Sequence, residues 1–363
     1  MAKVKAAVCH AHGEPLIIEE IDMRSPELGE LDVRIDAVAV CHSDVSLWQG
    51  GFGGPVPAVF GHEAAGTVVA VGPGVKGFAE GDSVAVTLIR ACGQCPSCGA
   101  GHPTVCESPG DAFDGPLTTA SGEKIWQALF TGAFAERVVV DQSQAVKIPD
   151  DIPKDAAALI SCGVITGLGA AINTADIRPG QDVVVIGAGG VGLNAIQGAR
   201  IAGARRIVAI DTNADKLEAA KQFGATHGVL GEGKPFREVK KLLGGRGADA
   251  VLVTVGVASV YDLAPRYLAN RGKVVMVGMP HFGSNASYSP FMMADAGQSI
   301  LGTKMGDVVI KTDIPWIVDM YQQGRLKLDE LISGRWSLDQ INEAMADTMS
   351  GTARRNVIVF DHG

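Results

Sequence analysis

The stretch DVVVIGAGGVG at residues 182–192 decides the fold of this chain. The apolar run Asp182–Ile186 leads into GAGGVG at 187–192, which matches the pattern G-x-G-x-x-G. The run predicts a strand buried on both faces, and the glycines predict a tight turn that opens a helix at Val191–Ala202. Asp211 follows the next expected strand, Arg206–Ile210, 24 positions after Gly187. In that context the pattern indicates a dinucleotide-binding βαβ unit.

The glycines and the helix after them form the expected phosphate site. Gly187 makes the turn, Gly189 lets a pyrophosphate approach the backbone, and Gly192 lets helix and strand pack closely. Gly190 and Val191 open the helix, whose N-terminus offers unpaired N–H groups and a positive dipole end to phosphates. The same pattern also occurs as a structural turn in α/β domains, but the acidic residue after the next strand argues against that interpretation.

This acidic residue sets the expected choice of cofactor. Asp211 is expected to accept hydrogen bonds from the adenosine ribose hydroxyls and to repel a 2′-phosphate. Lys216 lies one or two turns into the expected helix Asp215–Phe223 and is placed to reach the same ribose. The sequence therefore predicts NAD rather than NADP.

The chain around this motif contains two kinds of sequence. Before about residue 165 it reads as short strands broken by glycine and proline, typical of an irregular all-β or barrel-like domain: Val33–Val40, Ala64–Val71, Ser83–Thr87 and Ala135–Val140. From about Gly180, strands alternate with helices, which predicts an α/β domain with a parallel, doubly wound sheet. The last part adds two expected helices and a strand: Ile314–Gln323, Leu338–Met349 and Asn356–Phe360.

Composition limits the expected partners. The chain has 363 residues, 47% hydrophobic and 20% charged, with a net charge of −9. The length suggests two domains, and the acidic balance argues against binding of nucleic acid or anionic membrane. We expect no signal peptide, since Cys9, His10 and Glu14 interrupt the N-terminal apolar run, and no stretch approaching the ~18 apolar residues of a membrane helix. A cytoplasmic protein is expected.

Seven cysteines in such a chain favour metal binding or catalysis over disulfides. Cys92, Cys95, Cys98 and Cys106 lie within 15 residues, and four thiolates suit a closed, tetrahedral structural zinc. An iron–sulfur cluster is the alternative, because C-x2-C-x2-C also begins bacterial ferredoxin motifs. The final spacing of seven residues rather than three favours zinc. Cys9 is expected to be a small buried hydrophobe.

A second group of potential ligands is dispersed. Cys41 lies in VCHSD, His62 and Glu63 lie in FGHEAAG, and Cys162 lies in ISCGV. Taken alone, each is more often a buried cysteine or a satisfied histidine than a ligand, and spacing does not unite them. These motifs, the four-cysteine segment and the glycine motif nevertheless occur in the order and near the spacing found in the zinc-containing alcohol dehydrogenases. The chain resembles this family, part of the medium-chain dehydrogenase/reductase superfamily, over essentially its whole length.

The resemblance implies a GroES-like catalytic domain, residues 1–163 plus 305–363, and a Rossmann dinucleotide-binding domain at 164–304. It implies that Cys41, His62 and Cys162 hold a catalytic zinc with water or substrate as fourth ligand, so that each chain takes two zinc ions. The implied reaction transfers a hydride between an alcohol and NAD, giving an aldehyde or ketone. We expect a homodimer or homotetramer.

Further residues match family positions. Ser43 resembles the hydroxyl that takes the alcohol proton, Asp44 the carboxylate that orients His62, and Glu63 a carboxylate beside the metal. Contacts to the pyrophosphate and the nicotinamide are carried over by position to His42, Arg355, Thr166 and Val191.

The chain departs from the liver-type enzymes in three places. Ser46 occupies the position of the histidine that ends the proton relay, so the proton must leave through this hydroxyl, water or the ribose. Leu88 stands where an aromatic ring is usual, which predicts a pocket for medium-sized or aromatic primary alcohols. Phe52 and Leu129 are the other residues expected to line it. The segment between the last two cysteines is shorter, which leaves the loop 107–130 unassigned.

Other functions fit part of this pattern. A zinc-free quinone or enoyl reductase of the same superfamily lacks the cysteine ligands present here. Oxidation of S-hydroxymethylglutathione needs a basic clamp near the substrate, and residues 107–122 hold Asp111 and Asp114 but no lysine or arginine. A polyol dehydrogenase stays an alternative. A non-catalytic NAD-binding sensor is expected to lose Ser43 or a zinc ligand, and both are retained.

Overall fold

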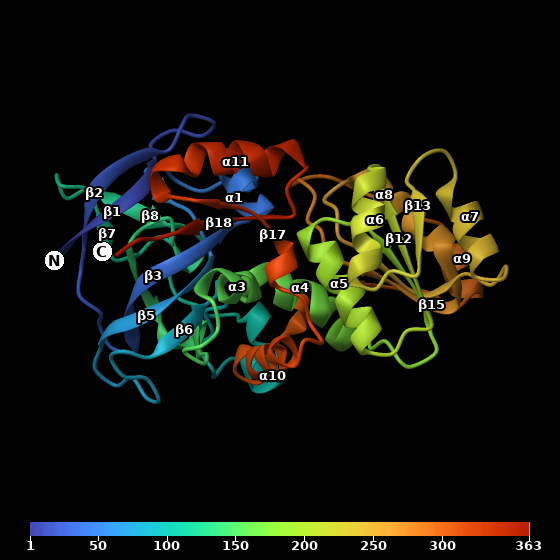
Figure 1. Ribbon diagram of the computed structural model, residues 1–363, viewed down its shortest axis with the longest axis horizontal. Coiled ribbons are helices and arrows are strands. Elements are labelled where there is room, and N and C mark those ends of the chain that lie inside the picture. Colours follow the sequence, from blue (N-terminus) through green and yellow to red (C-terminus); the bar gives the residue numbers. More distant parts are fainter. Residues whose placement is uncertain (363) are drawn as a thin grey trace. The chain divides into compact units, whose positions relative to one another are not determined.

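The computed structural model describes residues 1–362, and the chain divides into two compact units (Figure 1). Met1–Cys162 and Val309–Gly363 form the first unit, and Gly163–Val308 forms the second. The family resemblance predicts the domain boundaries after residues 163 and 304. Both cysteine groups belong to the first unit, and the glycine motif belongs to the second.

The second unit is built on a parallel sheet. In the described residues its strands follow the order β13-β12-β11-β14-β15-β16, each parallel to its neighbour. Their bounds are β11 Asp182–Ile186, β12 Arg206–Asp211, β13 His227–Leu230, β14 Ala248–Val253, β15 Leu268–Met276 and β16 Ser299–Gly302. From β11 the chain adds β12 and β13 on one side, and then β14, β15 and β16 on the other. With right-handed crossovers, this order places helices on both faces of the sheet. The expected doubly wound sheet is confirmed.

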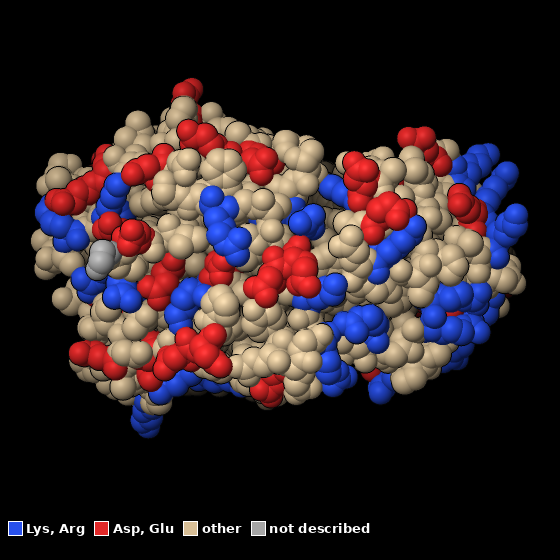
Figure 2. Space-filling view, viewed as in Figure 1, with Lys and Arg blue, Asp and Glu red and all other residues tan. Residues whose placement is uncertain are grey.

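The helices of this unit are α5 Gly190–Ile201, α6 Ala214–Phe223, α7 Pro235–Leu242, α8 Ala258–Leu263 and α9 Pro290–Asp295. α6 ends at Gly224, whose φ of 119° is left-handed, as suits a glycine after a helix. α8 ends at Leu263, because Pro265 follows it in a 3₁₀ turn and β15 begins at Leu268. Basic side chains gather at the end of this unit that carries α7 (Figure 2).

The first unit combines a closed barrel with a larger, mostly antiparallel sheet. The barrel contains β1 Ala2–Cys9, β2 Ile17–Met23, β7 Leu117–Thr118, β8 Lys124–Gln127 and β4 Ala58–Val59. The sheet order is β10-β6-β5-β3-β18-β17, with β9 also paired to β3. Their bounds are β3 Glu30–Val40, β5 Glu63–Val71, β6 Ser83–Val86, β9 Arg137–Asp141, β10 Ala145–Lys147, β17 Ile332–Trp336 and β18 Arg355–Val359. The expected β-rich, barrel-like domain is confirmed.

Four helices of the first unit are α1 His42–Trp48, α2 Pro96–Gly99, α10 Ile310–Gln322 and α11 Ile341–Ser350. A further helical run, Lys154–Thr174, begins in the first unit and ends in the second; it contains α3 Lys154–Leu159, a π turn at Ile160–Val164, α4 Ile165–Gly169 and a π turn at Ala170–Thr174. This run is long and apolar enough to span a membrane, with a mean hydropathy of 1.7, so the expectation that no stretch approaches this length was wrong. However, 83% of the apolar stretch in this run is buried inside the fold, as is typical of a core helix.

Candidate active site

Four buried side chains of the first unit form a compact group. The ligand atoms of Cys41, His62, Glu63 and Cys162 all lie within 4.8 Å of one another. Two sulfurs and an imidazole are a donor set that zinc favours, and three such ligands leave one tetrahedral position open. Among the described residues, Nε2 of His62 and both carboxylate oxygens of Glu63 are buried without a hydrogen-bond partner. The residues therefore fit a bound zinc ion.

Strand pairing brings the group together. Cys41 follows the end of β3, and Ala39 of that strand pairs with Glu63 at the start of β5. Cys162 lies in the π turn Ile160–Val164, and the buried hydroxyl of Ser161 donates to the carbonyl oxygen of Ala64 at 2.9 Å. The structure thus unites residues that spacing alone could not join.

Asp44 ties two of these ligands in place. Its Oδ1 lies 3.0 Å from Nδ1 of His62 and accepts the N–H of Gly61 at 3.0 Å, while its Oδ2 accepts the N–H of Cys41 at 3.0 Å. Asp44 and His62 are fully buried. With Nδ1 engaged, Nε2 is the imidazole nitrogen left for a metal.

Hydrogen bonding also favours a thiolate in this group. A hydrogen bond from Cys162 holds the pKa of Cys41 well below its usual range, while burial opposes this effect and His62 adds to it. The deprotonated sulfur is the form of cysteine that binds metals.

Arg355 lies beside the same group, at the start of β18. Its Nη1 is 3.2 Å from Oε1 of Glu63, and both side chains are buried. Burial raises the pKa of Glu63 to about 8, although the charge of Arg355 opposes this rise. No sequence signal joins positions 63 and 355, so this pair was missed. The expected contact between Arg355 and a pyrophosphate stays a prediction.

The residues expected to move the proton lie on α1. Ser43 and Ser46 are half-buried and three residues apart, which places them on one face of the helix. His42, expected at the pyrophosphate, is exposed at the start of the same helix. Phe52, expected in the pocket, follows α1 and is half-buried.

The other two expected pocket residues are also half-buried. Leu88 lies just beyond the end of β6 at Val86. Leu129 has a φ of 52° and Phe130 a φ of 59°, a left-handed conformation that residues with a side chain rarely adopt. This pair of unusual residues was not anticipated, because neither side chain is typical of that conformation.

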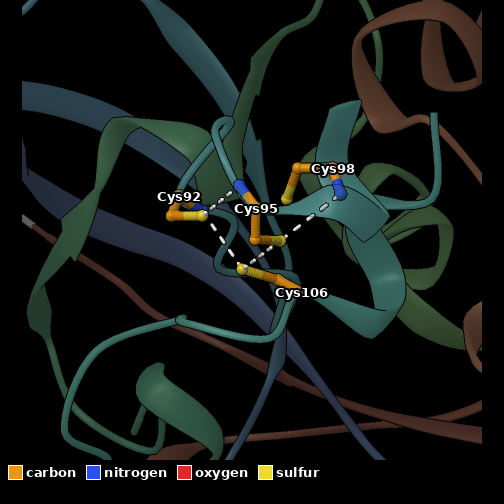
Figure 3. A group of neighbouring side chains, drawn as sticks. All are labelled: Cys92, Cys95, Cys98 and Cys106. Atoms are coloured by element: carbon orange, nitrogen blue, oxygen red, sulfur yellow. Dashed lines mark hydrogen bonds between the residues drawn. The ribbon is translucent and has the colours of Figure 1, made fainter. Parts of the chain in front are cut away.

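The four-cysteine segment forms a second group (Figure 3). The sulfurs of Cys92, Cys95, Cys98 and Cys106 lie within 4.8 Å of one another, close enough to share one ion. The Cys95 N–H donates to the sulfur of Cys92 at 3.3 Å, and the Cys98 N–H donates to the sulfur of Cys95 at 3.4 Å. Backbone N–H groups of Glu107 and Cys98 lower the pKa of Cys95 to about 6. Four converging sulfurs, some stabilised as thiolates, fit a closed metal site.

The glycine motif of the second unit makes the expected turn. Gly187 has a φ of 97°, and a Cβ on Gly192 would lie 1.8 Å from the carbonyl oxygen of Gly187. A Cβ on Gly189 would meet no protein atom within 4 Å, so the backbone there faces open space. Thr254, which sequence reasoning missed, donates its hydroxyl to the carbonyl oxygens of Ile186 and Gly187 at 3.0 Å each. Thr254 follows β14, so these two bonds fix the glycine turn to the neighbouring strand.

Asp211 lies at the end of β12 and contacts this turn. Its Oδ2 accepts the N–H of Ala188 at 2.8 Å, and its Oδ1 accepts the N–H of Asn213 at 3.0 Å. Each carboxylate oxygen has a further lone pair for a ribose hydroxyl. Lys216 is half-buried on α6, and Thr166 is half-buried on α4 with its hydroxyl 3.7 Å from the sulfur of Met305.

Comparisons with known proteins match this architecture. The model of the alcohol dehydrogenase GroES-like domain matches residues 27–150, and that of the zinc-binding dehydrogenase matches residues 190–323. An NDMA-dependent alcohol dehydrogenase of Amycolatopsis methanolica is 36% identical over 366 residues, which cover 98% of this chain and 99% of the relative. The chain belongs to the zinc-binding alcohol dehydrogenase family. As a member of this medium-chain dehydrogenase/reductase family, it is an oxidoreductase.

Two solved structures of the zinc-binding alcohol dehydrogenase family show the same fold. The alcohol dehydrogenase zinc-binding domain protein of Burkholderia ambifaria superposes with a TM-score of 0.95 at 36% identity, covering 99% of this chain and 100% of the other. The benzyl alcohol dehydrogenase of Acinetobacter calcoaceticus superposes with a TM-score of 0.94 at 30% identity, with the same coverage.

Proposed function

We propose that this protein oxidises medium-sized or aromatic primary alcohols, with NAD as hydride acceptor and two zinc ions per chain. The observation that carries the proposal is the buried group of Cys41, His62 and Cys162, with His62 held by Asp44. A similar protein that acts on benzyl alcohol supports an aromatic substrate. The overall change is balanced: the alcohol loses a hydride to NAD⁺ and a proton to the protein.

Each bound group would supply chemistry that the chain lacks: zinc as a Lewis acid at the alcohol oxygen, and NAD as acceptor of the hydride. Cys41, His62 and Cys162 would hold the catalytic zinc, and the four-cysteine group the structural zinc. Asp44 orients His62 and raises its basicity as a ligand.

The chain itself provides the route for the proton. Ser43 accepts the alcohol proton, and Ser46 passes it on from the same face of α1. A hydroxyl can do both because it accepts and donates hydrogen bonds at one atom. Replacing either hydroxyl should therefore slow proton release more than it weakens alcohol binding.

The chain's preference for NAD rests on Asp211. Its carboxylate retains lone pairs for the two ribose hydroxyls, and its charge repels a 2′-phosphate. Val191 and Thr166 are proposed to contact the nicotinamide, and Lys216 the ribose.

We also propose a homodimer or homotetramer. Large apolar side chains of the second unit are exposed, including Phe282 at 98%, Phe291 at 74% and Met279 at 64%. Exposed apolar groups of this size are typical of protein interfaces. Light scattering of the purified protein measures the number of chains directly, and a monomeric mass would contradict the proposal.

Initial rates with a panel of alcohols test the function. The panel contains primary aliphatic, secondary, aromatic and polyol substrates and S-hydroxymethylglutathione, each with NAD, NADP or NDMA as acceptor. NDMA is included because a relative is named for it. We expect the highest kcat/KM with medium-chain or aromatic primary alcohols and NAD. Failure to oxidise any alcohol at full zinc and NAD occupancy would overturn the proposal, and a preference for polyols or the glutathione adduct would favour those alternatives.

A further inference from the structure

A network of buried amides and hydroxyls joins the two segments that carry the leucines expected to line the substrate pocket. Its members are Thr87, Gln127, Thr131 and Gln144, of which the most exposed is Gln127 at 5%. The proposed chemistry uses none of them. Buried polar groups that are fully hydrogen-bonded specify the arrangement of the segments they join.

Gln144 joins two segments through a single nitrogen. Its Nε2 donates to the carbonyl oxygens of Thr87 and Phe130, each at 3.0 Å. Its Oε1 accepts the N–H of Asp141 at 3.2 Å. A side-chain amide has two N–H donors, so both are used to bridge the two carbonyls. One planar group therefore fixes the distance between the two segments.

Each bridged carbonyl is next to a pocket leucine. Thr87 precedes Leu88, and Phe130 follows Leu129. Thr131 adds a second link, since its hydroxyl donates to the carbonyl oxygen of Leu129 at 3.0 Å and lies 3.5 Å from that of Thr87.

The segment that Gln144 holds is strained. Leu129 and Phe130 have consecutive left-handed φ angles of 52° and 59°. Residues other than glycine persist in that conformation only where the surrounding structure holds them. Two contacts hold Phe130: the bond from Gln144 to its carbonyl, and the guanidinium of Arg90, 5.4 Å from the centre of its ring. Without Gln144, the turn loses the bond that ties the Phe130 carbonyl to the segment at Thr87.

Both segments lie beside the metal group. Val86, the last residue of β6, pairs with Ala64, the residue after Glu63. The segment that follows Val86 and carries Leu88 therefore begins next to the ligands. The N–H of Ala133 donates to the carbonyl oxygen of Gly61, the residue before His62, at 2.8 Å. A shift of residues 129–131 relative to 87–88 would therefore change the space beside the metal without moving a ligand.

We propose that Gln144 is a positioning residue that sets the width of the substrate pocket, by holding the strand end that carries Leu88 and the strained turn that carries Leu129 at a fixed separation. The inference rests on the proposed alcohol oxidation. It predicts that loss of the bridge changes which alcohol is preferred, not whether alcohol is oxidised.

The test compares Gln144→Met with Gln197→Met in the full-length protein. Both changes keep the length of the side chain and remove a buried amide, but Gln197 lies on α5 of the second unit and bonds to Asn194. For ethanol, butanol, hexanol and benzyl alcohol, kcat and KM are measured together with zinc content and Tm. In Gln144→Met the advantage in kcat/KM of the preferred alcohol over ethanol should fall by about fivefold, through its KM. The rate with ethanol and the zinc content should change by less than about twofold, and Gln197→Met should keep the ranking.

Four outcomes separate the interpretations. A Gln144→Met protein with a lower Tm and an unchanged ranking has lost only stability, which overturns the proposal. If that variant does not fold, Gln144→Asn replaces it, because asparagine keeps a buried amide but is one methylene too short to reach both carbonyls. A flattened ranking in Gln144→Asn supports the proposal, and an unchanged one overturns it. No alcohol oxidation by the unmodified protein would instead show that the proposed function is wrong.

Discussion

Asp44 accepts a hydrogen bond from the N–H of Cys41 with one oxygen, while its other oxygen lies 3.0 Å from Nδ1 of His62. Two expected ligands that are 21 positions apart in the chain are therefore oriented by one buried carboxylate. Loss of this carboxylate should disturb the metal group without removing a ligand.

We expect Asp44→Asn to weaken zinc binding and kcat/KM by about 10–100-fold, because an amide presents a donor where the carboxylate accepts. Zinc retained after dialysis against a weak chelator measures the first effect, and initial rates measure the second. Asp36→Asn is the control: it removes a carboxylate of β3 that accepts a hydrogen bond from Thr67, so its zinc content should match the natural protein. Equal zinc retention in both variants would contradict the role of Asp44.

The two cysteine groups should respond differently to loss of a sulfur. Cys95→Ser is expected to lower Tm, because a structural zinc contributes folding free energy, whereas Cys162→Ser is expected to abolish turnover with a smaller change in Tm. Metal analysis of the natural protein should give two zinc ions per chain. Iron with a visible charge-transfer band, or a single zinc, would show that one group has been misassigned.

Cofactor choice should follow Asp211. We expect the natural protein to prefer NAD strongly, and Asp211→Asn to shift the ratio of kcat/KM for NADP to that for NAD by at least about tenfold, or 1.4 kcal/mol. Asparagine removes the repulsive charge and keeps an oxygen for the N–H of Ala188. Asp211→Gly removes that acceptor too, so it should weaken both cofactors. Equal rates of the natural protein with the two cofactors would exclude the proposed ribose contact.

Leu88 should set the preferred size of alcohol. Each methylene buried in the pocket is worth about 0.8 kcal/mol, or roughly fourfold in kcat/KM, so medium-chain and aromatic primary alcohols should outperform ethanol. Leu88→Phe refills the space and should reverse this order. A chain-length profile of initial rates decides the matter, and an unchanged profile in the phenylalanine variant would remove Leu88 from the pocket.

A buried carboxylate of the second unit, paired with two partly exposed arginines, predicts how stability depends on pH. Asp182 is fully buried and accepts hydrogen bonds from Arg205 and Arg206 at 2.7 and 2.8 Å. Burial alone would raise the pKa of Asp182, but these hydrogen bonds outweigh it and the pKa lies below the usual value. Because the folded pKa is below the unfolded one, the pair stabilises the protein above about pH 4, and this stability is lost as the pH falls through the folded pKa.

We expect Asp182→Asn to lower the free energy of unfolding by about 2–3 kcal/mol at pH 7, with a difference that shrinks below about pH 4. Urea unfolding at several pH values measures both effects. Asp176→Asn is the matched control, since Asp176 pairs with Arg178 in the same unit but both side chains are exposed. Its effect should stay within about 1 kcal/mol. A difference at Asp182 that does not depend on pH would contradict the assigned pair.

Patterns local in the chain were the ones the sequence could predict. The strand and the glycine turn at 182–192 are confirmed. Both could be predicted because a buried strand requires consecutive apolar residues and a positive φ angle favours glycine. The expected ligands Cys41, His62 and Cys162 needed a family resemblance, because strand register and a helix bring them together. The bonds of Gln144 and the pair between Glu63 and Arg355 were missed, since buried polar contacts between distant segments have no periodicity.

The π turn that carries Cys162 makes this ligand sensitive to the number of residues in its helix. A π turn holds one residue more than the α-helical turn it replaces. Deleting one residue between Lys154 and Ser161 would let the helix return to regular winding and rotate the sulfur by about 100°. A related chain with a deletion at this position should therefore lack the catalytic zinc. Substitutions that keep the number of residues should leave the direction of the Cys162 sulfur unchanged.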